Sequence, residues 1–140
     1  MQPDERDPTK AEEWLRRARS NLLRAKAPKN DPEILFEDLC FDAQQAAEKA
    51  IKGLLVHLQI PFPKRHSISD LLTLVSAAGI EISAEISEAA ELTLYAVESR
   101  YPGILEAVEE EQYLKAVELA DRVVAWVERT IRQKTPQEAP

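Results

Sequence analysis

Glycine is scarce in this sequence, which contains only Gly53, Gly79 and Gly103 among its 140 residues. Hairpin turns and β-bulges commonly need glycine, because they require backbone conformations that other residues adopt with strain. The scarcity therefore argues against an all-β fold. It also excludes the P-loop and the dinucleotide-binding G-x-G-x-x-G motif, since neither can be assembled from three isolated glycines.

Nine prolines divide the chain into segments, because proline is tolerated in the first turn of a helix and stops a helix elsewhere. Within each segment apolar residues recur every three or four positions, which is the pattern of an amphipathic helix. The second of these segments starts at Asp31-Pro32 and is expected to form a helix of about 26 residues, close to 40 Å long. The five predicted helices cover approximately residues 8–27, 32–58, 67–78, 82–97 and 109–133.

These helices predict an all-α fold, an antiparallel up-and-down bundle of four to five helices. We expect one domain over residues 1–140, with polar tails at about 1–7 and 134–140. Gly53 lies inside the second helix, where it costs about 1 kcal/mol relative to alanine, and close approach of another helix would compensate. Gly79 is expected to end the third predicted helix in the left-handed backbone conformation. The apolar stripe of the fourth includes Leu94, which is expected to face the core.

The ends of the chain and its cysteine count narrow the class of protein. The first residues are polar and lack the apolar region of a signal peptide, and no apolar run approaches the length of about 20 residues that spans a membrane. We therefore expect a soluble, cytoplasmic protein. Cys40 is the one cysteine and is expected to be a buried, inert thiol, and with two histidines the sequence predicts no metal site.

Charge is unevenly distributed along the chain, whose formal net charge is -7. Residues 10–29 hold seven basic side chains against two acidic ones, whereas residues 81–121 hold eleven acidic side chains against two basic ones. We expect a dipolar molecule whose basic first helix attracts an anionic ligand or a complementary protein.

Two short segments carry side chains suited to anion binding. Arg100-Tyr101 ends the fourth predicted helix, where the guanidinium would either cap the last carbonyls or bind a phosphate or carboxylate. Arg65-His66 precedes the third predicted helix, where His66 would either cap that helix or contact a ligand. The residues alone leave both alternatives open.

Three segments together resemble the HEPN domain in order and spacing. They are Cys40-Phe41-Asp42-Ala43-Gln44-Gln45-Ala46-Ala47-Glu48-Lys49-Ala50-Ile51-Lys52, Arg65-His66-Ser67-Ile68 and Arg100-Tyr101-Pro102. The resemblance covers about residues 9–133 and is closest to the type associated with a minimal nucleotidyltransferase. It implies a dimeric helical bundle that is commonly one half of a prokaryotic two-component toxin–antitoxin module, with nucleotide binding assigned to some members.

The ribonuclease members of this family carry an Arg followed by a His after four to six intervening residues. Arg100 matches the Arg, but Leu105, Glu106 and Ala107 occupy the positions where the His would fall. No imidazole is therefore available in that motif as a general acid or base, which argues against RNA cleavage and leaves it open whether the chain is an enzyme. We expect no cofactor.

Three functions remain as hypotheses. The first is a nucleotide-binding or non-catalytic HEPN subunit with a nucleotidyltransferase partner, the second a degenerate ribonuclease toxin centred on Arg100, and the third a structural interaction module. The third hypothesis expects the polar residues Gln44, Gln45, Glu48 and Lys52 to satisfy one another or a partner helix. The predicted ligand contacts are Arg100, Tyr101, Lys52, Arg65 and His66.

Overall fold

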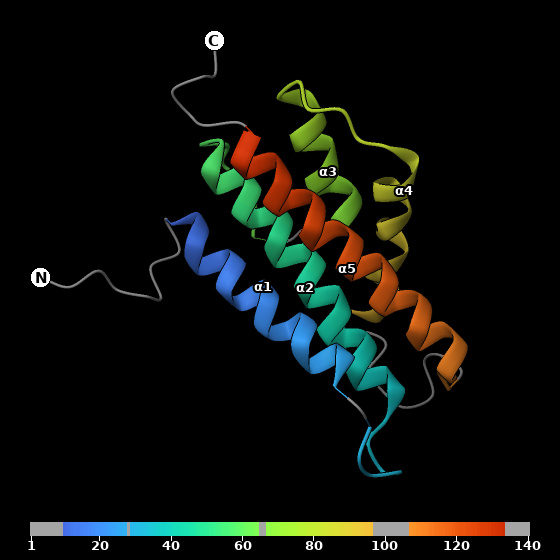
Figure 1. The fold of residues 1–140 in the computed structure, drawn as a ribbon. Helices are drawn as coiled ribbons and strands as arrows, with labels where there is room; N and C mark the ends of the chain where they lie inside the picture. The colour runs from blue at the N-terminus through green and yellow to red at the C-terminus, as the bar shows by residue number, and fades with distance from the viewer. Residues whose placement is uncertain (1–9, 28, 65–66, 97–106, 134–140) are drawn as a thin grey trace, which may run out of the picture.

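The computed structural model of the chain describes residues 10–27, 29–64, 67–96 and 107–133, and this part of the chain contains helices and no strand (Figure 1). The elements are α1 (Ala11–Lys26), α2 (Phe36–His57), α3 (Ile68–Ala77), α4 (Ala84–Ser87), the 3-10 helix η1 (Glu88–Tyr95) and α5 (Glu110–Gln133). The predicted all-α bundle is confirmed. The start predicted for the first helix, at about residue 8, and both polar tails lie outside the described residues.

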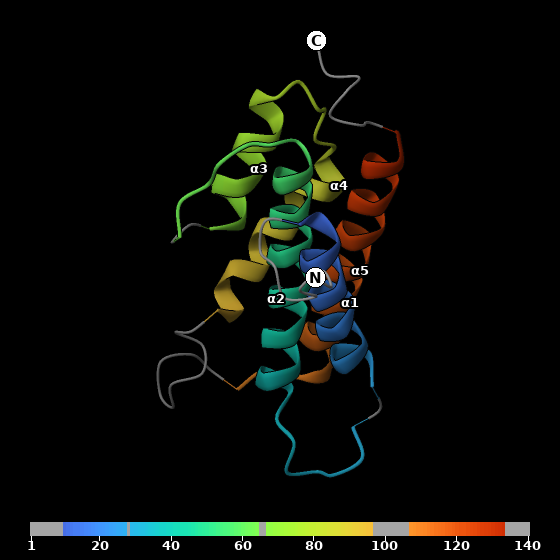
Figure 2. The same ribbon diagram turned by 90° about the vertical axis from the view of Figure 1, so that its left-hand side faces the viewer.

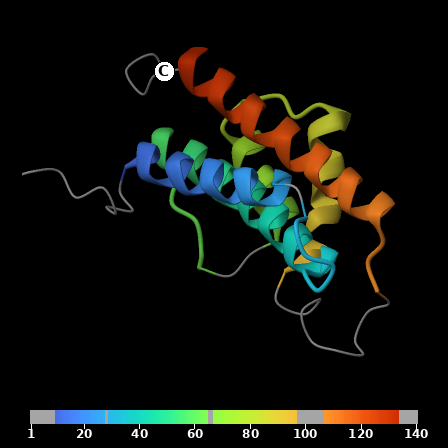
Figure 3. The ribbon, with the colours of Figure 1, turned by 60° about the horizontal axis from the view of Figure 1, so that its bottom comes forward.

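Helix α2 occupies the centre of the bundle and contacts α1, α3, η1 and α5. Figure 1 shows α1 antiparallel to α2, and the view in Figure 2 places α2 between α3 on one side and α1 and α5 on the other. In Figure 3 the α1–α2 pair lies along one side of α5. None of the described helices is long and apolar enough to cross a membrane.

Small side chains let α1 approach α2 closely. Ala43, Ala46, Ala47 and Ala50 of α2 are fully buried. A Cβ atom built on Gly53 would lie 3.1 Å from the Cβ atom of Trp14 and 3.5 Å from the carbonyl oxygen of Ala11, both on α1. The close approach predicted at Gly53 is therefore confirmed, and the packing gained there compensates for glycine in a helix.

Both ends of α3 are stabilised by local contacts. The Ser67 hydroxyl accepts a hydrogen bond from the Asp70 backbone N–H at 3.0 Å, and the Asp70 carboxylate accepts one from the Ser67 N–H at 3.2 Å. This reciprocal capping box satisfies two amide groups that the helix itself leaves free. Gly79 has φ 91°, the left-handed conformation expected of a residue that ends a helix.

The predicted start of the second helix is wrong. The Asp31 carboxylate accepts a hydrogen bond from the Glu33 N–H at 2.8 Å, and the Asp31 carbonyl accepts one from the Ile34 N–H at 3.0 Å. These bonds close an isolated turn instead of capping the helix, because Asp and Pro favour turns as well as helix starts. Helix α2 begins only at Phe36 and has 22 residues.

The fourth predicted helix is also different in the structure. It begins at Ala84, with the Ser83 hydroxyl accepting from the Ile86 N–H at 3.3 Å, and changes into the 3-10 helix η1 after one turn. A 3-10 helix has three residues per turn, so its buried positions are spaced differently from those of an α-helix. Leu92 is consequently buried, whereas Leu94, which was predicted to face the core, is 56% exposed.

Candidate functional site

The polar residues of α2 form one continuous chain of hydrogen bonds. Gln45 Nε2 donates to Gln44 Oε1 at 2.7 Å, Gln44 Nε2 donates to Glu48 Oε1 at 3.3 Å, and Lys52 Nζ donates to Glu48 Oε2 at 3.3 Å. Gln44 is only 2% exposed, so its amide depends on these partners. The expectation that these four residues satisfy one another is confirmed.

Lys52, a predicted ligand contact, lies inside this cluster. Its side chain is 13% exposed, and its ammonium lies 5.5 Å from the ring centroid of Trp14 and 5.8 Å from that of Phe62. The two rings meet edge to face with centroids 6.1 Å apart. The two aromatic rings and the Glu48 carboxylate therefore stabilise the ammonium of Lys52 in this position. The contacts of Lys52 thus join α1, α2 and the loop that carries Phe62.

A second polar cluster lies where α1 crosses the middle of α2. Asn21 Nδ2 donates to Asp42 Oδ1 at 3.0 Å, and Lys49 Nζ donates to Asn21 Oδ1 at 2.8 Å. Arg24 Nε lies 3.5 Å from Asp42 Oδ2. Burial lowers the pKa of Lys49, and the charge of Arg17 lowers it further. This cluster joins α1 to α2 through polar contacts.

The basic residues of α1 have acidic partners within the molecule. Each of its five cations forms an ion pair with an acid of α1, α2 or α5, and these cations are Arg16, Arg17, Arg19, Arg24 and Lys26. Segment charges predicted a basic face that attracts anions. The structure instead places acidic partners beside this helix, because α2 and α5 pack against it.

Cys40 is fully buried on α2, and burial, with a smaller contribution from the charge of Glu37, raises the pKa of its thiol to about 12. A thiol of this kind is inert at neutral pH, as expected. The described residues also contain no cluster of His, Cys, Asp and Glu able to hold a metal ion.

A different kind of surface lies between η1 and the first turns of α5. These elements form an apolar groove of about 900 Å³. Leu94 on one wall is 56% exposed and Leu114 on the other is 57% exposed. The apolar lining consists mainly of Leu92, Leu94, Tyr95, Leu114, Ala116 and Leu119. Large leucines exposed on both walls of one groove are typical of a surface that binds another molecule.

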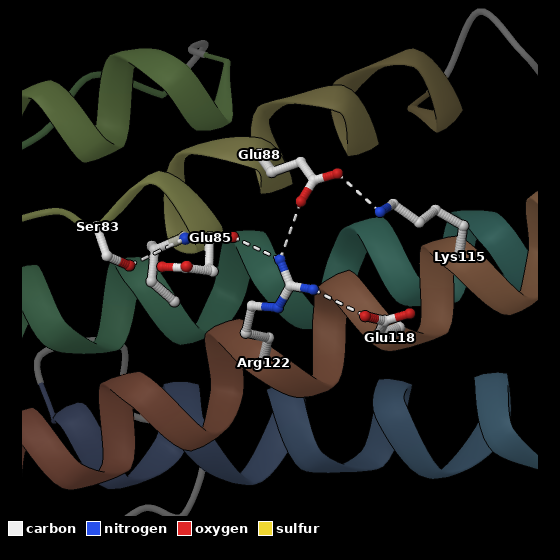
Figure 4. Close-up of polar contacts among 7 residues, drawn as sticks. Ser83, Glu85, Glu88, Lys115, Glu118 and Arg122 are labelled. Atoms are coloured by element: carbon white, nitrogen blue, oxygen red, sulfur yellow. Dashed lines mark hydrogen bonds and ion pairs between the residues drawn. The ribbon is translucent and has the colours of Figure 1, made fainter.

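An ion-pair network joins η1 to α5 beside this groove (Figure 4). Glu88, the first residue of η1, binds Lys115 Nζ at 2.7 Å and Arg122 Nη1 at 3.1 Å. Arg122 Nη1 also donates to the carbonyl of Glu85 at 2.8 Å, and Arg122 Nη2 binds Glu118 at 2.8 Å. Hydrogen bonds from Lys115 and then Arg122 hold the pKa of Glu88 below its usual range. The network ties α4 and η1 to α5.

Comparison with known proteins identifies the family. The sequence model of the HEPN domain matches residues 11–130. The chain belongs to the HEPN family. Its fold is similar to that of ST0689, an archaeal HEPN homologue, with TM-score 0.69 and 31% identity over 87% of this chain and 98% of that one. It is also similar to TT1696 from Thermus thermophilus, with TM-score 0.70 and 33% identity over 85% of this chain and 96% of that one. No curated protein matches the chain.

Most of the predicted HEPN ligand contacts fall on parts of the chain that the structure leaves undescribed. Arg65, His66, Arg100 and Tyr101 lie outside the described residues, so Lys52 is the one whose surroundings are known. Residues 97–106, which include Arg100 and Tyr101, lie between η1 and α5 in the sequence. The elements η1 and α5 are the two walls of the groove. The groove is therefore adjacent in sequence to the motif of the HEPN ribonucleases.

Sequence reasoning missed the groove itself. Leu114 falls outside the apolar stripe of the last helix, and this departure from the pattern was the available signal for one wall. For Leu94 no such signal existed, because an α-helix and a 3-10 helix fit the same short apolar pattern.

Proposed function

We propose that this HEPN chain is a non-catalytic subunit that acts by binding other proteins, in a two-component pair with a minimal nucleotidyltransferase. The groove between η1 and α5 carries the proposal, since it exposes Leu94 and Leu114 on opposite walls. A folded protein that keeps two large apolar side chains exposed in one groove gains stability when a partner covers them.

The polar part of the described structure supports the same function. Chemistry on a substrate requires polar groups that are free to contact it. On α2 the amide and carboxylate groups of Gln44, Gln45 and Glu48 bind one another, and Lys52 is held by Glu48 and two aromatic rings. The ribonuclease motif has no His at residues 105–107. Support for RNA cleavage is therefore weaker than support for association.

We further propose that the chain forms a homodimer, because HEPN domains are generally dimeric. The pairing with a nucleotidyltransferase is tested by co-expression of the full chain with the product of its adjacent gene, followed by size-exclusion chromatography with light scattering. A stable complex with a minimal nucleotidyltransferase is the expected result. A chain that binds no such protein contradicts the proposal.

Two further assays test the two alternative functions, RNA cleavage and nucleotide binding. If the chain alone cleaves RNA, and Arg100→Ala abolishes cleavage while Arg129→Ala does not, the chain is a ribonuclease and the proposal is wrong. Arg129 is a suitable control because it is an exposed arginine near the end of α5. Calorimetry with ATP and GTP is expected to show no binding. Binding that Arg100→Ala weakens would assign a nucleotide-binding function to Arg100 instead.

A further inference from the structure

Acidic side chains line the apolar groove on both sides. Glu91 belongs to the η1 wall and Glu111 to the α5 wall, and both line the groove and are exposed. Neither forms an ion pair with any residue that the structure describes. Among the described residues, the basic residue of the lining is Lys115, and Glu88 neutralises it at 2.7 Å. The groove therefore has an apolar floor and negative charge that is uncompensated among the described residues.

This charge distribution selects the class of partner. A second copy docked through the same groove would bring two negatively charged patches together, because the same patch of both copies forms a two-fold interface. Like charges brought together in an interface disfavour the complex. A cationic partner instead gains from both the apolar floor and the acidic edges.

The dimensions of the groove select the shape of the partner. The α5 wall runs from Glu111 to Leu119, which corresponds to about 12 Å or two helical turns. A groove between two helices accepts a third helix, whose apolar residues at positions i, i+3 or i+4 and i+7 fill it. Leu94 and Leu114, on opposite walls, would contact the two sides of such a stripe.

We propose that the η1–α5 groove binds a short amphipathic helix of a partner protein, with apolar residues between Leu94 and Leu114 and with Lys or Arg facing Glu91 and Glu111. This inference rests on the proposed function and adds the chemistry of the partner. The net charge of -7 favours the same partner at longer range, because it attracts a cationic chain before contact.

The experiment uses the full chain and two fluorescein-labelled peptides of the same length and the same leucine stripe. One peptide has lysines on both flanks of the stripe and the other has glutamates. Fluorescence anisotropy at low and high salt measures the affinities. The lysine peptide is expected to bind about tenfold or more tightly than the glutamate peptide, and its affinity is expected to fall with salt.

Variants locate the binding site. Leu114→Asp is expected to weaken binding of the lysine peptide about tenfold or more, and Glu91→Lys with Glu111→Lys is expected to reverse the preference between peptides. Leu23→Asp is the matched control, because Leu23 is an exposed leucine of α1, 69% exposed and away from the groove lining. These positions are exposed, so each variant is expected to fold, and circular dichroism verifies it.

Each other outcome overturns the inference. Equal binding of both peptides, or binding unaffected by Leu114→Asp, excludes a cationic helix in this groove, as does no binding at all. If Leu114→Asp converts a dimer into a monomer, the groove is an interface between copies. Filling of the groove by residues 97–106 would appear as peptide binding that improves when this segment is replaced by a glycine–serine linker. In these cases a complex with the nucleotidyltransferase still supports the proposed function, whereas Arg100-dependent RNA cleavage contradicts that function whatever the peptides do.

Discussion

The polar face of α2 and the η1–α5 groove differ in how their side chains are satisfied. On α2, the side chains of Gln44, Gln45, Glu48 and Lys52 bind one another. In the groove, two leucines and two acids are exposed without partners among the described residues. The comparison shows that polar residues in a distinctive sequence segment can contact one another within the fold, while segments of ordinary composition form an exposed apolar groove.

The largest difference between the two regions is expected in the free energy of unfolding. Leu54→Ala removes a fully buried side chain of α2 and is expected to cost about 2–5 kcal/mol. Leu114→Ala removes an exposed side chain of the groove and is expected to change stability by about 0.5 kcal/mol or less. Urea denaturation of both variants measures the two values. A loss from Leu114→Ala as large as that from Leu54→Ala would show that Leu114 is buried in solution and that the groove is already occupied.

The next effect tests how tightly α1 packs against α2 at Gly53. Gly53→Leu places a side chain where a Cβ atom alone would lie 3.1 Å from Trp14 Cβ, so α1 must move away from α2. Overpacking of this kind is expected to cost about 1–3 kcal/mol. Gly53→Ala is the control, since its smaller clash is opposed by a gain of about 1 kcal/mol in helix propensity. If Gly53→Leu unfolds in urea like the wild type, α1 and α2 do not pack as closely as the structure shows.

The closeness at Gly53 was predictable because a glycine inside a helix needs a local reason. The helices themselves follow from apolar periodicity. In contrast, the start of α2 at Phe36 depended on whether Asp31 caps a turn or a helix, and the same sequence allows both. Features decided by a single residue's conformation were predictable, and features decided by competition between two local structures were not.

The candidate site shows the same limit. The chain Gln44–Glu48–Lys52 has a spacing of four residues along one helix, so mutual contact could be inferred from the sequence. The groove depends on the 3-10 conformation of η1 and on how η1 lies against α5, and both depend on tertiary packing. The ion pairs between α1 and α5 could not be predicted for the same reason, because Asp121 and Glu128 are distant from α1 in sequence.

A smaller effect decides whether Lys52 holds the fold together or contacts a ligand. Lys52→Met removes an ammonium that binds Glu48 and lies over Trp14 and Phe62, and it is expected to cost about 1 kcal/mol. Urea denaturation measures this loss. Calorimetry with ATP is expected to give the same heat for the variant and the wild type. If the wild type binds ATP and folded Lys52→Met does not, Lys52 is a ligand contact, and the contrast between α2 and the groove fails.

The smallest effect concerns the network that joins the two walls of the groove. Lys115 and Arg122 hold the pKa of Glu88 below its ordinary value of 4.5, so the charged carboxylate is favoured in the folded state. Its contribution to stability is fully present above the ordinary value and is lost as the pH falls through the lower value of the folded state. Glu88→Gln is expected to lower Tm by about 2 °C or less at pH 7, because water reaches the ion pairs of Glu88 with Lys115 and Arg122. This difference in Tm is expected to shrink towards pH 3.

Glu81→Gln is the control for that comparison, because Glu81 is exposed and outside the network, and it is expected to leave Tm unchanged. A Tm difference for Glu88→Gln that stays constant from pH 7 to pH 3 would contradict a role for its charge. The same variant also removes the carboxylate charge that neutralises Lys115 in the groove lining. An unpaired ammonium there repels a cationic helix, so Glu88→Gln is expected to weaken the lysine peptide slightly and to strengthen the glutamate peptide. The network thus does more than hold η1 against α5, because by neutralising Lys115 it keeps the groove negative.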